Sequence, residues 1–123
     1  MRIFKTKWFN RYAMREGIED KALTEAVKRA EKGLVDAELG GNLLKLRIPR
    51  KGQGRSSGYR TLLAYKKNKR AVFLYGFAKS ERENIDGDEL KSLKELANAW
   101  LKAGDQEISH SLSYDLLSEV SYE

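Results

Sequence analysis

The chain has 123 residues, of which 34% are charged and 41% hydrophobic, and its formal net charge at pH 7 is +6. A chain of this size and composition is expected to fold as one globular domain. It has no cysteine and one histidine, His110, which excludes disulfides, cysteine-ligated metal centres and multi-histidine metal sites. We therefore expect neither a metal nor another cofactor. No stretch approaches the ~20 apolar residues that a membrane-spanning helix needs, and no signal peptide is evident, so we expect a cytoplasmic protein without membrane contact.

The N-terminal segment contains patterns for a strand and a helix. Residues 2–6 mix charged and apolar side chains and predict a short strand. Trp8, Phe9 and Tyr12 follow at helical spacing and predict a helix that ends near Glu16. This aromatic cluster could stack on nucleic-acid bases, but packing in the core is the commoner role of such residues.

A second helix is predicted from Ile18 to Gly33. Its apolar residues recur three and four positions apart and form one face, made of Ala22, Leu23, Ala26, Val27 and Ala30. The segment that follows ends in Gly-Gly-Asn, which is a turn signal before the next element.

Three consecutive strands are predicted between Leu43 and Arg82. Apolar residues alternate with Lys and Arg over 43–48, and the runs 59–65 and 70–77 are rich in strand-forming residues. A basic glycine-rich segment joins the first two strands, and Asn68 suits the tight turn between the last two.

Positive charge is concentrated in these strands. The 40 residues from Leu43 to Arg82 contain one acid, Glu81, against twelve basic residues, a balance of +11. A surface that gathers cations without interleaved acids is typical of a face that binds a polyanion.

A third helix is predicted from Glu89 to about Lys102. Asp86 and Asp88 are its candidate N-caps, and Gly104 is its expected end. With the elements before it, this helix completes a predicted α+β domain over residues 1–104.

The last segment, residues 105–123, is an acidic tail of the same domain or an extension from it. Residues 83–123 hold ten acids and three lysines, a balance of −7, so the tail could fold over the basic sheet. Its apolar residues predict a short helix or a final strand and are Tyr114, Leu116, Leu117 and Val120.

The residue types in the basic strands suit phosphate chemistry better than other reactions. The glycine-rich segment lies between two strands, so it lacks the strand-to-helix context of a nucleotide-binding loop. A Ser/His/Asp site would need His110 from the tail. Arginine binds phosphate oxygens in pairs and could stabilise the charge that builds when a ribose 2′-hydroxyl attacks its own phosphate.

Several short motifs resemble the RelE/ParE superfamily of type II toxin–antitoxin toxins, in particular its HigB-like branch. They are K-x-R at Lys45 to Arg47, a basic glycine-rich loop, G-Y-R ending at Arg60, G-F-x-K ending at Lys79, and an acid-rich helix beyond. The resemblance covers about Ile18 to Trp100.

The resemblance implies a small α+β domain. In that fold two N-terminal helices pack on one face of a twisted antiparallel sheet of about four strands, and a C-terminal helix follows. The other face of the sheet would be a concave basic surface.

The resemblance also implies an activity, because toxins of the RelE and HigB type cut mRNA on the ribosome. Arg60 would stabilise the phosphorane, with Lys79 and Arg82 completing the catalytic group. The RNA-binding residues would be Lys45, Arg47, Arg50, Lys51 and Arg55. Expected partners are the ribosome, mRNA and a cognate antitoxin of the helix-turn-helix type.

The sequence departs from the family pattern in its proton-transfer groups. Some members place a tyrosine shortly after the last basic cluster, where this chain has Asn84, Ile85 and Asp86. HigB-type members use loop histidines, which this loop lacks. The general acid and base are thus unassigned, unless His110, Tyr114 or Tyr122 approaches from the tail.

Two alternatives stay open at this point. A ParE-like toxin directed at gyrase would share the fold without cutting RNA. A non-catalytic nucleic-acid-binding protein would share the basic surface without a general acid or base.

Overall fold

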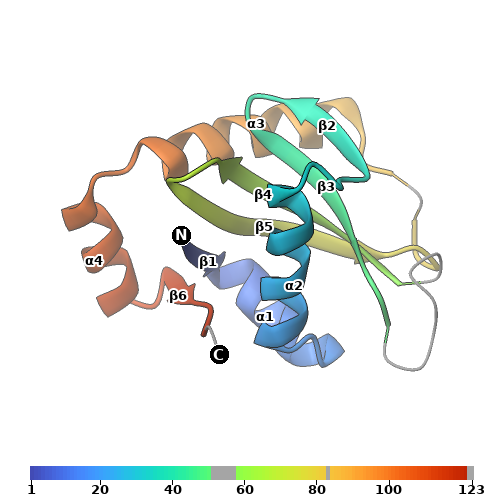
Figure 1. Cartoon of the computed structure of the whole chain (residues 1–123), viewed down its shortest axis with the longest axis horizontal. Helices are drawn as coiled ribbons and strands as arrows, with labels where there is room; N and C mark the ends of the chain where they lie inside the picture. Colours follow the sequence, from blue (N-terminus) through green and yellow to red (C-terminus); the bar gives the residue numbers. More distant parts are fainter. Residues whose placement is uncertain (51–57, 83, 122–123) are drawn as a thin grey trace.

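A six-stranded sheet runs through the molecule, with helices on both of its faces (Figure 1). The computed structural model describes residues 1–50, 58–82 and 84–121. In chain order the elements are β1 (Arg2–Thr6), α1 (Lys7–Glu16), α2 (Asp20–Glu31), β2 (Ala37–Gly40), β3 (Leu43–Ile48), β4 (Tyr59–Lys66), β5 (Arg70–Ala78), α3 (Gly87–Lys102), α4 (Asp105–Ser113) and β6 (Leu117–Glu119).

The strands lie in the order β2-β3-β4-β5-β1-β6. The neighbours are antiparallel except for β1 and β5, which run parallel. The predicted α+β class is confirmed, whereas the prediction of about four strands is wrong in count, and one pair of neighbours, β1 with β5, is parallel. Edge strand β2 has four residues, which is too short for an alternating pattern to reveal it, and the tail pattern predicts the three-residue β6 only as an alternative to a short helix.

One face of the sheet carries α1 and α2. The Thr6 side chain accepts a hydrogen bond from the Phe9 amide and so caps α1, which ends at Gly17 with φ 73°. The α1 helix lies very close to β5, because a Cβ added at Gly76 would come within 3.1 Å of the Tyr12 ring. Buried side chains from both helices and the sheet form this core, including Ile3, Phe9, Leu23, Val27, Leu46 and Phe73.

The opposite face carries α3 and part of α4. Asp86 caps α3, and the Glu89 side chain accepts a hydrogen bond from the Asp86 amide, so the two form a capping box. The second core between α3, α4 and the sheet includes Phe4, Leu43, Leu62, Val72, Leu101 and Ile108. The expectation of a concave basic surface on this side of the sheet is therefore wrong, because the apolar side of α3 covers the middle of the sheet.

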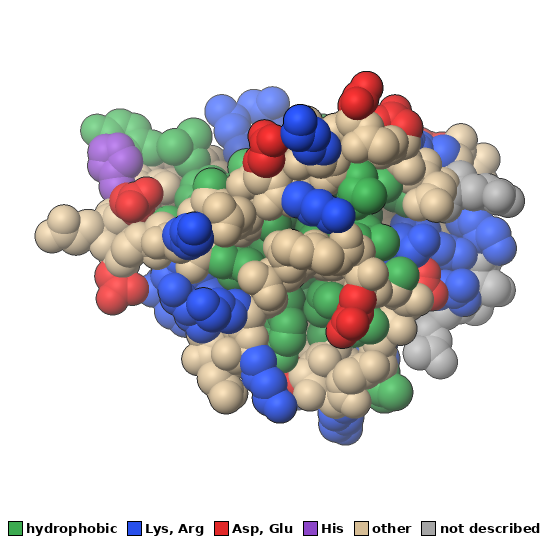
Figure 2. Space-filling model, turned by 90° about the horizontal axis from the view of Figure 1, so that it is seen from above, with side chains coloured by type: hydrophobic (Ala, Val, Ile, Leu, Met, Phe, Trp, Pro, Cys, Tyr) green, Lys and Arg blue, Asp and Glu red, His purple; other side chains and the backbone are tan. Residues whose placement is uncertain are grey.

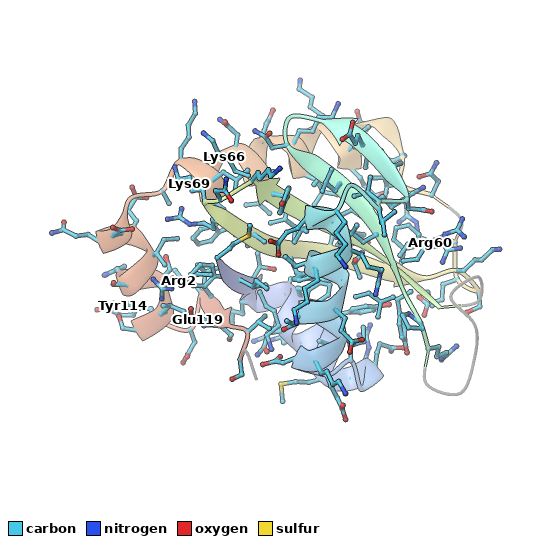
Figure 3. All side chains as sticks on the ribbon, viewed as in Figure 1. Arg2, Arg60, Lys66, Lys69, Tyr114 and Glu119 are labelled. Atoms are coloured by element: carbon cyan, nitrogen blue, oxygen red, sulfur yellow. The ribbon has the colours of Figure 1, made fainter. Side chains whose placement is uncertain are left out.

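The acidic tail forms α4 and β6, so the final strand that is one of the two predictions for this segment is present at Leu117–Glu119. Strand β6 pairs with β1, and Arg2 donates two hydrogen bonds of 2.8 and 2.9 Å to Glu119. Figure 3 places Tyr114 and Glu119 at the end of the sheet opposite to Arg60. The tail thus does not fold over the cations around Arg60.

None of the described helices combines the length and the apolar character that a bilayer crossing requires.

Candidate nucleic-acid interface

The register of three strands brings the predicted arginines together. Arg47 on β3 pairs with Arg60 on β4, and Arg60 pairs with Phe77 on β5. Residues paired across strands point to the same face, with Cβ atoms about 5 Å apart. The two guanidinium-bearing side chains are therefore neighbours at one end of the sheet.

Two further cations complete this cluster. The Lys79 amide donates a 3.3 Å hydrogen bond to the Gly58 carbonyl, next to the start of β4, and the Arg82 guanidinium lies 5.4 Å above the Phe77 ring. We call Arg47, Arg60, Lys79 and Arg82 the basic corner. Figure 2 shows Lys and Arg side chains gathered at this end of the molecule, on the right of the view, with acidic side chains among them.

Arg60 is the buried member of the basic corner. It is 5% exposed, and its cross-strand neighbour Phe77 is 3% exposed. A guanidinium surrounded by protein interacts more strongly with an anion than one in bulk water, because the effective dielectric constant is lower. Burial therefore strengthens the electrostatic interactions that the Arg60 guanidinium makes.

Arg82 is fixed by the N-terminus of α3. Its two terminal nitrogens donate to the Glu89 carboxylate at 2.5 and 3.2 Å, and its Nε donates to the Asn84 carbonyl at 2.9 Å. The pKa of Arg82 is raised by the hydrogen bond to Glu89 and, among smaller effects, by the nearby Tyr75 hydroxyl. Arg82 thus contributes positive charge from a defined position.

An acid from outside the basic strands also enters this face. Asp36, just before β2, lies 2.7 Å from the Arg47 Nε and 4.0 Å from the Lys45 Nζ. The expectation of a face free of acids is therefore wrong at β3. The pairing is invisible in the sequence of the basic strands because Asp36 precedes them and approaches only through the β2–β3 hairpin.

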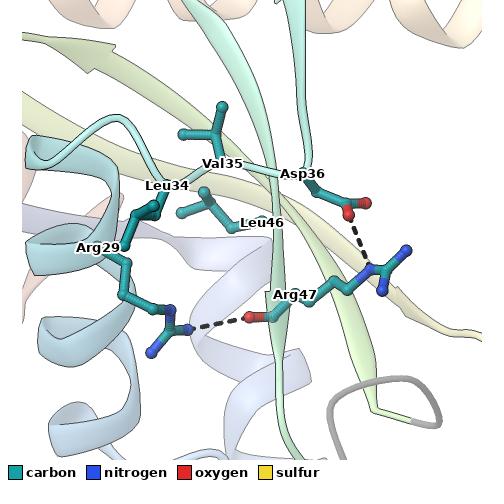
Figure 4. A pocket seen from close by; sticks show the side chains of 6 residues that line it. All are labelled: Arg29, Leu34, Val35, Asp36, Leu46 and Arg47. Atoms are coloured by element: carbon teal, nitrogen blue, oxygen red, sulfur yellow. Dashed lines mark hydrogen bonds and ion pairs between the residues drawn. The ribbon is translucent and has the colours of Figure 1, made fainter.

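The same ion pair borders a hollow of about 570 Å³ between α2 and β3 (Figure 4). On its other side Arg29 donates a 3.0 Å hydrogen bond to the Arg47 carbonyl. Both the backbone and the side chain of Arg47 are thus held in place, which limits how far its guanidinium can move toward a ligand.

Arg50 lies away from the basic corner. Its guanidinium is 5.6 Å above the Tyr59 ring, whose hydroxyl donates to the Glu16 carbonyl on the α1 side of the sheet. Lys51 and Arg55, the other predicted loop residues, lie outside the described residues. Of the predicted RNA-binding set, the structure thus brings Arg47 to the basic corner and places Lys45 beside it.

Tyr75 is a neighbour of the basic corner that sequence reasoning missed. Its ring centroid lies 6.4 Å from that of Phe77 and 4.4 Å from that of Trp8. A register shift in β5 opposite Leu62 and Leu63 turns Tyr75 onto the same face as Arg60. Simple alternation of side chains from Phe73 assigns Tyr75 to the opposite face of the sheet. The bulge therefore makes the true orientation of Tyr75 unpredictable from the sequence pattern.

The tail residues do not reach the basic corner. The His110 and Tyr114 rings contact each other at 4.5 Å, at the end of the sheet opposite to Arg60 (Figure 3). The suggestion that either supplies the general acid or base is therefore wrong, and Tyr122 lies outside the described residues. Over 1–50, 58–82 and 84–121, no group of three or more His, Asp or Glu side chains is arranged to hold a metal ion.

One comparison with known proteins identifies the family of the chain. A family model described as the RelE toxin of the RelE/RelB toxin–antitoxin system matches residues 1–120. The match extends beyond the motifs, which ended near Trp100, and includes α4 and β6. A search of curated proteins finds no match. Because the family model covers nearly the whole chain, the chain belongs to the RelE toxin family, a family of toxins whose partner is an antitoxin.

Proposed function

We propose that this RelE toxin cuts mRNA on the translating ribosome in the cytoplasm, as a HigB-like endonuclease. The reaction is attack of a ribose 2′-hydroxyl on the adjacent phosphate, with release of the 5′-oxygen of the next nucleotide. The observation that carries the proposal is the in-register pairing of Arg47, Arg60 and Phe77, which leaves Arg60 within a cluster of cations.

Arg60 is the residue to which we assign the main catalytic effect. Negative charge builds on the non-bridging oxygens of the phosphate during the attack, and a guanidinium already in place stabilises that charge. Lys79, exposed at the end of β5, adds a second positive charge that can move with the substrate. Arg82 adds charge from its fixed position beside Glu89.

Tyr75 is our candidate for proton transfer to the leaving 5′-oxygen. It is half-buried and packs beside Phe77, over which the Arg82 guanidinium lies. A general acid must lie within reach of the atom that it protonates, and Tyr75 is a hydroxyl group at the margin of the basic corner. It offers a tyrosine from β5 where the family pattern has one after the last strand.

The remaining expectations complete the proposal. Lys45, Lys51 and Arg55 would bind RNA phosphates around the cut, and Arg50, on the α1 side of the sheet, would bind a phosphate farther from it. The antitoxin would be of the helix-turn-helix type. Arginine and lysine on a surface of this kind bind phosphate without reading sequence, so the choice of message would come from the ribosome.

Mapping of mRNA ends in cells after induction tests this function. Wild-type protein should stop growth and produce new 5′ ends within translated messages. Arg60→Ala should produce neither, while Lys69→Ala, exposed at the opposite end of the sheet (Figure 3), should behave as wild type. Growth arrest with intact mRNA and a DNA damage response would contradict the proposal and indicate a gyrase-directed toxin.

A further inference from the structure

The first helix carries a row of three exposed cations. Lys7, Arg11 and Arg15 are four residues apart, so they follow one side of α1 at steps of about 6 Å. Arg15 has one ion pair, with the adjacent Glu16 at 3.3 Å, and none is found for Lys7 or Arg11 within the described part of the chain. We call these three residues the α1 row.

Helix stability accounts for Arg15, which lies in the last turn of α1, but not for Lys7. Lys7 is the first residue of α1, and the first turn contains no acid. The N-terminus of a helix favours acids and disfavours cations. The position of Lys7 is thus unfavourable for the helix itself, which indicates a use outside it.

The α1 row borders a hollow of about 450 Å³ that is also lined by two aromatic residues. Trp8 and Tyr12 line this hollow with the three cations, and the two rings stack at 5.2 Å with an angle of 16°. The Trp8 side chain is 44% exposed, which is unusual for so large an apolar group.

Tyr12 supports the exposed indole of Trp8. The residue is 3% exposed, and its ring stacks on Trp8. Its hydroxyl is buried and has no hydrogen-bond partner in the described part of the chain. Burial, followed by the nearby carboxylates of Glu16 and Glu81, raises the pKa of Tyr12, so the hydroxyl keeps its proton. Tyr12 therefore contributes its ring rather than its hydroxyl to the lining of the hollow.

An aromatic path connects this hollow to the basic corner. Trp8 contacts Tyr75 at 4.4 Å, Tyr75 contacts Phe77 at 6.4 Å, and Arg82 lies above Phe77. Strand β5 pairs with β1 only as far as Phe73, so this path crosses beyond the end of β1. A strand bound at the basic corner could thus continue onto α1.

We propose that the α1 row, Trp8 and Tyr12 form a second RNA subsite that binds single-stranded RNA beside the cut. The three cations would bind phosphates, the exposed Trp8 ring would stack on one base, and the Tyr12 ring would hold the Trp8 ring in place. An exposed indole among cations suits an unstacked base, which duplex RNA does not offer. The proposal rests on the proposed function for the identity of the ligand as mRNA.

Binding of a short fluorescent single-stranded RNA to the full chain tests the subsite. The RNA carries 2′-O-methyl groups so that it cannot be cut, and no ribosome is present. Lys7→Ala/Arg11→Ala/Arg15→Ala should weaken binding at least tenfold and reduce the slope of log Kd against log salt by about 2. The matched control, Lys21→Ala/Lys28→Ala/Lys32→Ala, removes the same charge from exposed positions on and just after α2 and should stay within twofold of wild type.

A second variant tests the stacking role. Trp8→Leu keeps an apolar side chain against Tyr12 and Tyr75, and it should lose about fivefold or more in single-strand affinity with no change in salt slope. Equal effects of the two triple variants would overturn the subsite, as would a loss of antitoxin binding with unchanged RNA affinity. Tighter binding of duplex RNA by wild type would also overturn it.

The RNA subsite and the proposed mRNA cleavage can be refuted independently of each other. Arg60-dependent mRNA cuts with no role for the α1 row would refute the subsite alone. RNA binding that depends on the α1 row, in a protein that cuts no mRNA, would refute the proposed function alone.

Discussion

Arg82 and Glu89 join the basic corner to the third helix. Two nitrogens of Arg82 donate to the Glu89 carboxylate, and the same carboxylate accepts the Asp86 amide as part of the α3 capping box. One acid thus both caps a helix and orients a cation of the candidate site. Substitutions at the start of α3 should therefore alter the orientation of Arg82 in the basic corner.

Replacing Glu89 with Gln should raise RNA affinity and leave the fold intact. The amide keeps the shape of the side chain but removes its negative charge, so Arg82 becomes available to phosphate. Dissociation constants of the uncleavable RNA, measured for wild type and Glu89→Gln, check this. Asp88→Asn, on the neighbouring exposed position, is the matched control, and a weaker Glu89→Gln complex would show that Arg82 does not contact RNA.

Replacing Asp36 with Asn should also strengthen RNA binding. Asp36 neutralises Arg47 and lies near Lys45, and its removal would let both cations bind phosphate. The slope of log Kd against log salt should steepen by about 1. Glu38→Gln, an exposed acid on β2, should have a smaller effect, and equal slopes for wild type and both variants would contradict this role of Asp36.

Arg70 should be the strongest contributor to stability among the basic residues of the sheet. It is 7% exposed and donates hydrogen bonds of 2.7 and 2.8 Å to the Trp100 and Ala103 carbonyls, where α3 ends. Arg70→Met should lower the free energy of unfolding by about 2–3 kcal/mol, because two carbonyls lose their donors. Urea denaturation measures this loss, and Lys69→Met, exposed next to it, should cost little. Equal urea midpoints for Arg70→Met and Lys69→Met would refute the contribution of Arg70 to stability.

The β6 anchor should weaken in acid. The hydrogen bond from Arg2 lowers the pKa of Glu119 below its usual value of 4.5 in the folded state. A carboxyl with a lowered pKa stabilises the fold above its unfolded pKa, and the effect is lost as the pH falls through the folded value. The difference in stability between wild type and Glu119→Gln should thus be constant near neutral pH and shrink below about pH 4. A difference that grows toward acid would contradict this.

Local patterns in the sequence predicted most of the elements that form the fold. Alternation identified β3, apolar runs identified β4 and β5, and the cap signal at Asp86 marked the start of α3. What the sequence could not show depends on contacts between distant segments. The parallel pairing of β1 with β5 joins residues about seventy positions apart, and the antiparallel pairing of β1 with β6 joins residues more than one hundred positions apart.

The candidate site, like the fold, was predictable only where it depends on local sequence patterns. Arg47, Arg60, Lys79 and Arg82 do meet at one end of the sheet, as the strand pattern implied. The acids that pair with them, Asp36 and Glu89, come from other elements, and the bulge in β5 conceals Tyr75. Charge counted along the sequence therefore overstated the positive charge of this surface.

The most direct test of the account is the rate of mRNA cleavage on purified translating ribosomes by variants at Arg60. Arg60→Ala should lower the rate by about a hundredfold or more, because the guanidinium that stabilises the negative charge of the phosphorane is lost. Since Arg60 is buried, Arg60→Lys serves as a second variant that keeps the charge without the paired donors and should be intermediate. Cleavage at the wild-type rate by a folded Arg60→Ala protein would contradict the account.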